Sequence, residues 1–308
     1  MKLTAAAIQM PSIQGDPVRN LAKADERLAE AHAAGAAIAV LPEMVFSGYG
    51  LIPDYAPLSE TVEGPTLTHL RERSRQWKMA IASGFVERDG SHLYDSLALC
   101  LPDGRCTVYR KQNLVFWERF RFKPGRQSVI AETPFGRIGL TICADMIFRH
   151  VWEGFRGTID LAIISAAWPD FACRETGQKH WLFGHVGPLS ASIPAKVAED
   201  LGIPVIFANQ VGETKTQIPY LGTWITDKIA DRFSGKSCIA DGRHGAAVIA
   251  GSGDQTVFSE ITIHPQKGLR TWRSMYRSGS AASSSDLEPI GLASKPFGSI
   301  AARAVSVP

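Results

Sequence analysis

Short apolar runs alternate with amphipathic stretches along the first hundred residues of the chain. Residues 3–10 form a β-prone apolar run, which predicts a buried strand. Asp16 and Pro17 follow, an N-cap residue with proline at the first helical position, so a helix is expected to begin there. The residues at helical spacing that we expect to share one face of this helix are Val18, Leu21, Asp25, Leu28 and His32.

The same alternation continues to the end of the apolar part of the sequence. Further strands are predicted at residues 36–41, 79–86, 94–101, 106–111, 136–143, 161–167 and 205–209, with helices at 66–77 and 148–156. Asp89-Gly90 is typical of a hairpin turn between two of these strands. Because wholly apolar strands alternate with helices, the sequence predicts an α/β fold whose sheets are covered by helices.

The composition supports one large folded unit followed by a tail. Hydrophobic residues make up 45% and charged residues 20% of the 308 positions, which excludes a mainly disordered chain. The apolar pattern ends near residue 265, so we expect one domain over residues 1–265. Residues 266–308 form a tail whose segment 278–285 is rich in Ser, Gly and Ala, as in a linker.

Charge and cysteine content exclude several partners. The formal net charge is only +3 and basic residues are not clustered, so no nucleic-acid partner is expected. The longest apolar stretch, residues 161–168, is too short to span a membrane. The N-terminus lacks a signal-peptide pattern, and the five cysteines show no zinc-ligand spacing. We therefore expect a cytoplasmic protein with reduced thiols.

Three predicted strands end in a reactive or ionisable residue, namely Glu43, Lys111 and Cys143. Ligands of α/β sheets gather at the carboxyl ends of strands, so these positions are candidates for chemistry. A thiolate is a nucleophile, a carboxylate can take up and return its proton, and an ammonium can stabilise an oxyanion. The three residue types together predict nucleophilic acyl transfer.

Other interpretations of the same residues stay open at this point. A cysteine in an apolar strand is often an inert hydrophobic residue, and Glu43 or Lys111 could be solvated surface charges. A Cys–His pair is the rival catalytic arrangement, because His150 lies seven residues after Cys143. That spacing gives no geometric support to such a pair.

Several segments resemble the nitrilase superfamily of carbon–nitrogen hydrolases. Residues 41–44, 109–114 and 136–145 are similar to its three signature blocks, in the family's order and at its usual separations. Residues 208–212 and 233–237 agree with the family as well. The resemblance spans roughly residues 3–264 and implies a four-layer α-β-β-α sandwich without a metal or an organic cofactor.

The resemblance also implies roles for particular residues. It assigns Glu43, Lys111 and Cys143 as the catalytic set and matches Glu118 to a second family glutamate, which could otherwise be a surface carboxylate. The residues that it places at the substrate are Tyr49, Trp168 and Ala144, the last through a backbone N–H that would face the oxyanion. Asp145 matches an aspartate expected to be structural.

The residues after the cysteine bear on the substrate. Cys143-Ala144-Asp145 resembles amidases and carbamoylases, whereas nitrilases typically read Cys-Trp-Glu at this point. We therefore expect hydrolysis of a small amide or N-carbamoyl compound. The alternatives are a nitrile substrate or a catalytically idle binding protein on the same fold. Carbamoylases tend to carry two arginines where this chain has Met146 and Ile147, so no carboxylate anchor is expected there.

Association of the chain with itself is expected from the same resemblance. Family members pair through helices near the nucleophile and often lay a C-terminal tail across the partner. The apolar positions that form a helical stripe here are Phe148, Val151, Trp152 and Phe155. We expect a homodimer or a higher even homo-oligomer, with residues 266–308 ordered against the partner subunit.

Overall fold

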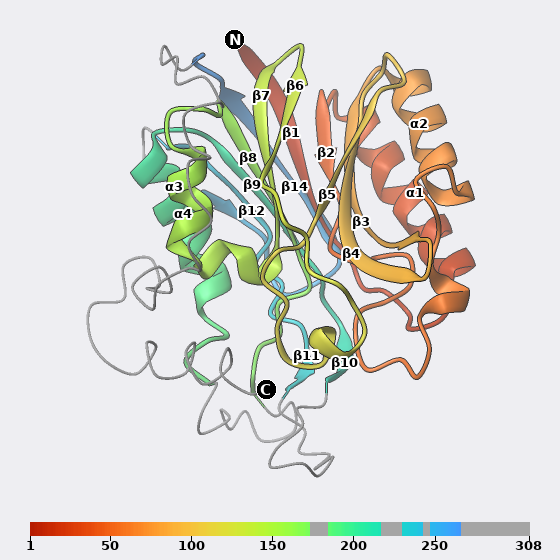
Figure 1. Cartoon of the computed structure of the whole chain (residues 1–308). Coiled ribbons are helices and arrows are strands. Elements are labelled where there is room, and N and C mark those ends of the chain that lie inside the picture. The colour runs from red at the N-terminus through yellow and green to blue at the C-terminus, as the bar shows by residue number, and fades with distance from the viewer. Residues whose placement is uncertain (173–183, 217–229, 243–246, 266–308) are drawn as a thin grey trace.

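Two six-stranded β-sheets pack face to face in the computed structural model of the chain, which describes residues 1–172, 184–216, 230–242 and 247–265 (Figure 1). The first sheet has the order β14 (Gln255–Thr262), β1 (Lys2–Gln9), β2 (Ile38–Val40), β3 (Ala80–Asp89), β4 (His92–Cys100), β5 (Cys106–Arg110). The second has the order β13 (Ala247–Ile249), β12 (Cys238–Ala240), β9 (Val205–Asn209), β8 (Leu161–Ala166), β7 (Gly136–Ile142), β6 (Val129–Thr133). A separate ribbon pairs β10 (Glu213–Thr216) with β11 (Ala230–Arg232).

Helices cover the outer face of each sheet (Figure 1). Helices α1 (Pro17–Ala33) and α2 (Pro65–Trp77) lie on the first sheet, and α3 (Arg149–Phe155) and α4 (Leu189–Leu201) lie on the second. Three short 3₁₀ turns are η1 (Ala56–Leu58), η2 (Phe116–Phe120) and η3 (Cys143–Ile147). This layer order confirms the predicted α/β fold and four-layer α-β-β-α sandwich.

Each sheet is buried on both faces, which explains the wholly apolar strands. On β4, Leu97 and Leu99 face the space between the sheets, whereas Ala98 and Cys100 face the helices. Aliphatic side chains from the second sheet, such as Ile163, fill the other side of that space. Burial of apolar area on this scale is the main stabilising contribution in such a fold.

Helix α1 begins where the sequence predicts, but its buried face differs from the expected one. Asp16 Oδ1 accepts a hydrogen bond from the Arg19 backbone N–H at 3.1 Å, as an N-cap does. The buried residues are Asn20, Ala24, Leu28 and Ala31, whereas Val18 is 78% exposed. The prediction favoured large apolar residues, yet small alanines let the helix lie close to the sheet. Leu28 is buried as expected and Leu21 is partly buried against the same core, so the expected face was wrong at Val18 and His32, which are exposed.

The apolar stripe of α3 packs inside its own subunit. Its four predicted members are all buried, namely Phe148, Val151, Trp152 and Phe155. Trp152 Nε1 also donates to the Met146 carbonyl at 2.9 Å, which fixes the indole against η3. The stripe therefore leaves no exposed apolar face for a partner. It does not support the predicted homodimer. The tail at 266–308 lies outside the described residues.

Among the described helices, none is both long enough and apolar enough to cross a lipid bilayer.

Candidate active site

The ends of strands from both sheets meet at one buried cluster of ionisable side chains. Glu43 follows β2 and Lys111 follows β5 in the first sheet, and Cys143 follows β7 in the second. Glu43 and Lys111 have no exposed surface, and Cys143 is 3% exposed. The structure thus brings together the three residues that the sequence singled out, and Glu118 of η2 joins them.

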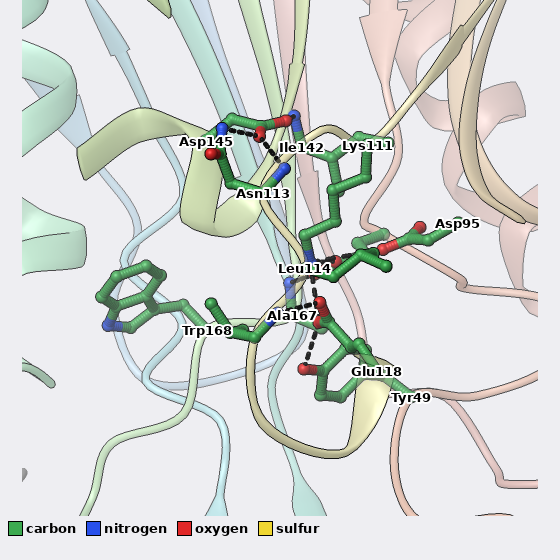
Figure 2. Close-up of polar contacts among 12 residues, drawn as sticks. Tyr49, Asp95, Lys111, Asn113, Leu114, Glu118, Ile142, Asp145, Ala167 and Trp168 are labelled. Atoms are coloured by element: carbon green, nitrogen blue, oxygen red, sulfur yellow. Dashed lines mark hydrogen bonds and ion pairs between the residues drawn. The ribbon is translucent and has the colours of Figure 1, made fainter. Parts of the chain in front are cut away.

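The ammonium of Lys111 is the centre of this cluster (Figure 2). Nζ donates to Glu43 Oε1 at 2.6 Å and to Glu118 Oε1 at 2.7 Å, and it lies 3.3 Å from Asp95 Oδ2. Burial by itself lowers the pKa of Lys111, but the charges of Glu118, Glu43 and Asp95 outweigh burial and raise that pKa well above its usual range. Lys111 is therefore a permanent cation at neutral pH.

Glu43 is held by contacts to its side chain and its backbone. Oε2 accepts a hydrogen bond from the Ala167 backbone N–H at 2.7 Å, while Oε1 faces Lys111. Gln210 Nε2 donates to the Glu43 carbonyl at 2.7 Å. These donors directly follow β8 and β9, so the ends of two strands of the second sheet fix the position of a carboxylate that belongs to the first.

Close packing of backbone also places Glu43. A Cβ built on Gly84 of β3 would lie 2.5 Å from Glu43 Cα and 2.6 Å from Met44 N. Such distances are below any normal contact, so this position requires a residue without a side chain. The backbone atoms cannot move away without displacing the Glu43 carboxylate.

Replacing Gly84 with alanine is expected to lower the free energy of unfolding by about 1–3 kcal/mol, the usual cost of overpacking. Any activity that depends on the Glu43 carboxylate should fall as well, because Glu43 is displaced. Gly253→Ala is the matched control, since a Cβ there meets nothing within 4 Å. Urea unfolding of both variants measures the difference, and equal stability of the two would contradict the steric argument.

Glu118 is hydrogen-bonded through both oxygens. Oε1 accepts from Tyr49 Oη at 2.7 Å as well as from Lys111, and Oε2 accepts from the Val115 backbone N–H at 2.8 Å. Burial raises the pKa of Glu118, Lys111 lowers it, and Glu43 raises it further. Tyr49, predicted to contact substrate, directs its hydroxyl to this carboxylate and is 4% exposed.

Cys143 lies at a sharp change of backbone direction between β7 and η3. Its φ of 47° is in the left-handed region, which is uncommon for a residue with a side chain. Burial raises the pKa of its thiol well above the ordinary value, and the charge of Glu43 raises it further. The resting group is therefore a thiol, and its proton must pass to a base before the sulfur can attack.

Asp145 connects the turn at Cys143 to the segment that follows β5. Its Oδ2 accepts from Tyr109 Oη at 2.7 Å and from the Ile142 backbone N–H at 3.1 Å. Its Oδ1 accepts from Asn113 Nδ2 at 2.8 Å and from the Asn113 backbone N–H at 3.1 Å (Figure 2). Four hydrogen bonds to one buried carboxylate are consistent with the structural role expected of Asp145.

Asp95 belongs to the cluster, although the sequence analysis did not single it out. It is fully buried on β4, and neither of its oxygens accepts a well-aligned hydrogen bond, despite the nearby Lys111 ammonium. Burial raises its pKa well above the usual range, and the charge of Glu43 adds to that rise. An acidic residue inside a predicted strand, opposite Lys111 across the predicted hairpin, was the signal that could have identified it.

Three carboxyl groups of this cluster also have the proximity of metal ligands. Oxygens of Glu43, Asp95 and Glu118 lie within 4.8 Å of one another. The Lys111 ammonium forms ion pairs with all three, so a cation is already present among them. The donor set therefore fits an internal ammonium rather than a bound metal ion.

Two residues considered in the sequence analysis lie apart from the Lys111 ammonium. The indole of Trp168 points away from the Lys111 cluster, and its Nε1 donates to the Val186 carbonyl at 3.1 Å (Figure 2). His150 is exposed on α3, and its ring centroid lies 5.8 Å from that of Phe148. The rival Cys143–His150 pair is therefore not supported by the structure.

A buried Glu–Lys–Cys cluster between two sheets of an α-β-β-α sandwich defines a class of hydrolase, and comparison with known proteins identifies it. The family model for carbon-nitrogen hydrolase matches residues 4–243. The chain belongs to the carbon–nitrogen hydrolase family, which confirms the resemblance found in the sequence.

Individual relatives carry names from several branches of the family. A nitrilase of Pyrococcus abyssi is 33% identical over 147 residues, which cover 46% of this chain and 56% of that protein. An omega-amidase of Bos taurus is 31% identical over 195 residues, or 58% of this chain and 67% of that protein. The chain thus spans only a little over half of the archaeal nitrilase.

Solved structures share the fold at lower sequence identity. A CN-hydrolase superfamily protein from Xanthomonas campestris aligns with a TM-score of 0.68 at 21% identity, over 85% of this chain and 91% of that one. An amidase from Nesterenkonia sp. aligns with a TM-score of 0.67 at 19% identity, over 87% and 93%. Both similarities show the fold.

Proposed function

We propose that this chain hydrolyses the C–N bond of a small, uncharged carboxamide through a thioester on Cys143. The observation that carries the proposal is the buried ammonium of Lys111, 2.6 Å from Glu43, beside a cysteine at a left-handed turn. Relatives named omega-amidase and (R)-stereoselective amidase support an amide. Another relative is named nitrilase, so the preference for an amide over a nitrile rests on the Cys143-Ala144-Asp145 sequence. A solved amidase from Nesterenkonia sp. is described with a Michael adduct of acrylamide at its active-site cysteine.

In the first half-reaction, Glu43 takes the proton from Cys143 and the sulfur attacks the carbonyl carbon. The oxyanion that forms is stabilised by Lys111 Nζ and the Ala144 backbone N–H. The tetrahedral intermediate collapses with cleavage of the C–N bond, and Glu43 gives its proton to the departing nitrogen. Ammonia or an amine leaves, and the acyl group stays on sulfur as a thioester.

In the second half-reaction, Glu43 removes a proton from water, which attacks the thioester. The carboxylic acid product leaves, and the sulfur recovers its proton from Glu43. Glu118 keeps Lys111 oriented through the 2.7 Å contact, and the Tyr49 hydroxyl keeps Glu118 in place. In this account, Glu118 and Tyr49 position the ammonium rather than exchange protons.

The charge of the described cluster favours an uncharged substrate. Glu43 and Glu118 are both paired with the single ammonium of Lys111, so an additional carboxylate near the cysteine would be repelled. Met146 is fully buried in the core, so its side chain offers nothing to a substrate carboxylate. We therefore expect a simple amide to be preferred over an N-carbamoyl amino acid.

The test is a comparison of matched substrates with ammonia release as the readout. Short aliphatic amides, their nitriles, and carbamoyl compounds with and without a carboxylate are measured under the same conditions. The proposal expects the highest kcat/KM for a neutral amide. A higher kcat/KM for the corresponding nitrile would overturn the assignment to amides, and a preference for the carboxylate-bearing compound would overturn the charge argument.

We further infer that Asp95 carries a proton at neutral pH. Three buried carboxyls share one ammonium, and Asp95 has the fewest hydrogen-bond donors among them. A neutral Asp95 leaves Glu43 and Glu118 as the carboxylates beside Lys111. Its proton is bound more tightly in the folded protein than in the unfolded chain, so the contribution of Asp95 to wild-type stability should fall as pH rises above the ordinary Asp range of about 3.9.

Asp95→Asn is therefore expected to stabilise the protein near pH 7 by about 1–3 kcal/mol, the scale on which an unsatisfied buried polar group costs stability. The amide resembles a protonated carboxyl, with its oxygen toward Lys111 and its NH₂ toward Glu43. Measurement of the free energy of unfolding from pH 4 to pH 8 checks the prediction. The gain over wild type should grow with pH, and Asp95→Ala serves as the control without a polar group. A pH-independent loss in Asp95→Asn would contradict a protonated Asp95.

We also propose that the chain associates as a homodimer or a higher even homo-oligomer. In the described residues, Val248 and Ile249 of β13 are 49% and 45% exposed at the edge of the second sheet. Exposed apolar residues on an edge strand favour association. Light scattering at micromolar concentration should give an even multiple of the subunit mass, and a monomer would contradict the proposal.

A further inference from the structure

Two cysteines face each other across the last hairpin of the first sheet. Cys100, at the end of β4, is the direct partner of Cys106, at the start of β5. The neighbouring pair is joined by a hydrogen bond from the Leu101 N–H to the Arg105 carbonyl at 2.8 Å. Hydrogen-bonded and non-hydrogen-bonded pairs alternate in an antiparallel ladder, so the cysteines occupy a non-hydrogen-bonded pair.

This type of pair has the spacing that a disulfide requires. Directly opposed residues in non-hydrogen-bonded positions have Cα atoms about 4.5 Å apart and side chains on the same face of the sheet. Disulfides form when the Cα atoms are about 4.4–6.8 Å apart. Cys100 and Cys106 are both free thiols in the structure, and a bond between them needs no change of register.

The two thiols have unequal surroundings. Cys100 is fully buried, whereas Cys106 is partly exposed on the edge strand β5 and lies close to the guanidinium of Arg71 on α2. A hydrogen bond from Cys100 lowers the pKa of Cys106, and Arg71 lowers it further. The hydrogen bond to Cys106 raises the pKa of Cys100, and burial raises it further. Cys106 is thus the more accessible and the more acidic of the two thiols, and Cys100 is the buried thiol beside it.

We propose that Cys100 and Cys106 form an oxidation site that reacts with small hydroperoxides and retains the oxidised state as a reversible disulfide. The thiolate of Cys106 attacks one oxygen of the peroxide, the O–O bond breaks, and hydroxide leaves and takes up a proton. Cys106 is then a sulfenic acid. The Cys100 sulfur, after losing its proton to water, attacks the Cys106 sulfur and displaces hydroxide. Two thiols and one hydrogen peroxide give one disulfide and two waters.

The site is separate from the hydrolase cluster. Cys100 packs among the residues beneath α1 and α2, and Cys106 packs against that core, on the helix-covered face of the first sheet. Tyr109 of β5 faces the opposite side, toward the second sheet. The inference therefore goes beyond the proposed function, and substitution of Cys106 should leave amide hydrolysis unchanged.

The printed sequence allows a direct measurement of this disulfide. Trypsin cleaves after Arg88, Arg105 and Arg110, so Cys100 and Cys106 fall on the separate peptides 89–105 and 106–110. The intact, folded protein is treated with hydrogen peroxide, its remaining thiols are alkylated, and it is digested. We expect the two peptides to appear joined, with the loss of two hydrogen atoms, and to separate again after dithiothreitol.

Variants test the order of events and the part played by each sulfur. Cys106→Ser should abolish the joined peptide, and Cys100→Ser should leave a sulfenic acid on Cys106 that dimedone traps. Arg71→Gln should slow formation of the disulfide several-fold because the thiolate loses its neighbouring cation. Cys238, whose pKa burial raises to about 12, is the internal control and should stay reduced.

Two results would overturn the proposal. One is that peptides 89–105 and 106–110 remain separate after peroxide has already oxidised Cys143. The other is that Cys106 accumulates as sulfinic acid in the wild type as fast as in Cys100→Ser, which would mean that Cys100 does not react with the sulfenic acid. Neither result depends on the rate of amide hydrolysis, so failure here is distinguishable from failure of the proposed function.

Discussion

Replacing Cys143 with alanine is expected to abolish amide hydrolysis and to reduce ammonia release to the background rate. The proposed thioester cannot form without the sulfur of Cys143. The loss should be at least about 10³-fold in kcat, the scale on which removal of a nucleophile acts. Cys143→Ser should retain at most trace activity, because Glu43 is a weak base for a hydroxyl.

The matched control for this variant is Cys106→Ser, which removes another thiol of the protein, outside the Lys111 cluster. It should keep the activity of the wild type. Because Cys143 is 3% exposed and fills space in the core, circular dichroism and urea unfolding must show that Cys143→Ala is folded. A folded Cys143→Ala variant with activity above about one hundredth of wild type, the scale of lesser catalytic contributions, would contradict the assignment of the nucleophile.

Glu43→Gln and Lys111→Met are each expected to reduce kcat nearly as far as loss of the cysteine. Glu43 is the proposed base in both half-reactions, and Lys111 is the proposed oxyanion donor. Because each step needs both groups, the double variant should be little slower than either single variant. Measurement of kcat for the three variants checks this, and losses that add in log rate would contradict a common catalytic unit.

For stability, the double variant is expected to behave differently from the way it behaves in catalysis. Lys111→Met leaves the buried Glu43 and Glu118 carboxylates without a counter-charge, at a cost of about 3–5 kcal/mol. Adding Glu43→Gln removes one of those charges, so the double variant should be more stable than Lys111→Met alone. Urea unfolding therefore separates a folding defect from a catalytic one in the single variant.

Much of the fold and the convergence of the candidate catalytic residues could be predicted from the sequence because local signals agree there with the global fold. Buried strands read as wholly apolar runs, and Pro17 after Asp16 marks the start of α1. The residues that end three of these strands are the ones that the structure brings together. Strand ends that converge at one place explain why residues distant in the sequence could be recognised as a group.

Other features depend on contacts that no local pattern reveals. Asp95 lies opposite Lys111 in the β4–β5 pair, where the Lys111 backbone N–H donates to the Asp95 carbonyl at 2.9 Å, so the register of these two strands places its carboxyl beside the ammonium. Helix α4 was not predicted, because Pro194 lies inside it and proline normally interrupts a helix. The hydrogen bond from the Tyr49 hydroxyl to Glu118 was not predicted, because the sequence does not specify the path of the turn that carries Tyr49.

The most direct test of the account is to capture the acyl group on the enzyme during turnover. The wild-type protein is mixed with a short aliphatic amide, quenched in acid within the time of a few turnovers, and digested with trypsin. Cys143 falls on peptide 138–149, which carries no other cysteine. The account predicts that this peptide gains the mass of the acyl group and loses it on treatment with hydroxylamine. Ammonia release at the full rate without an adduct on this peptide, or with the adduct on another residue, would contradict the account.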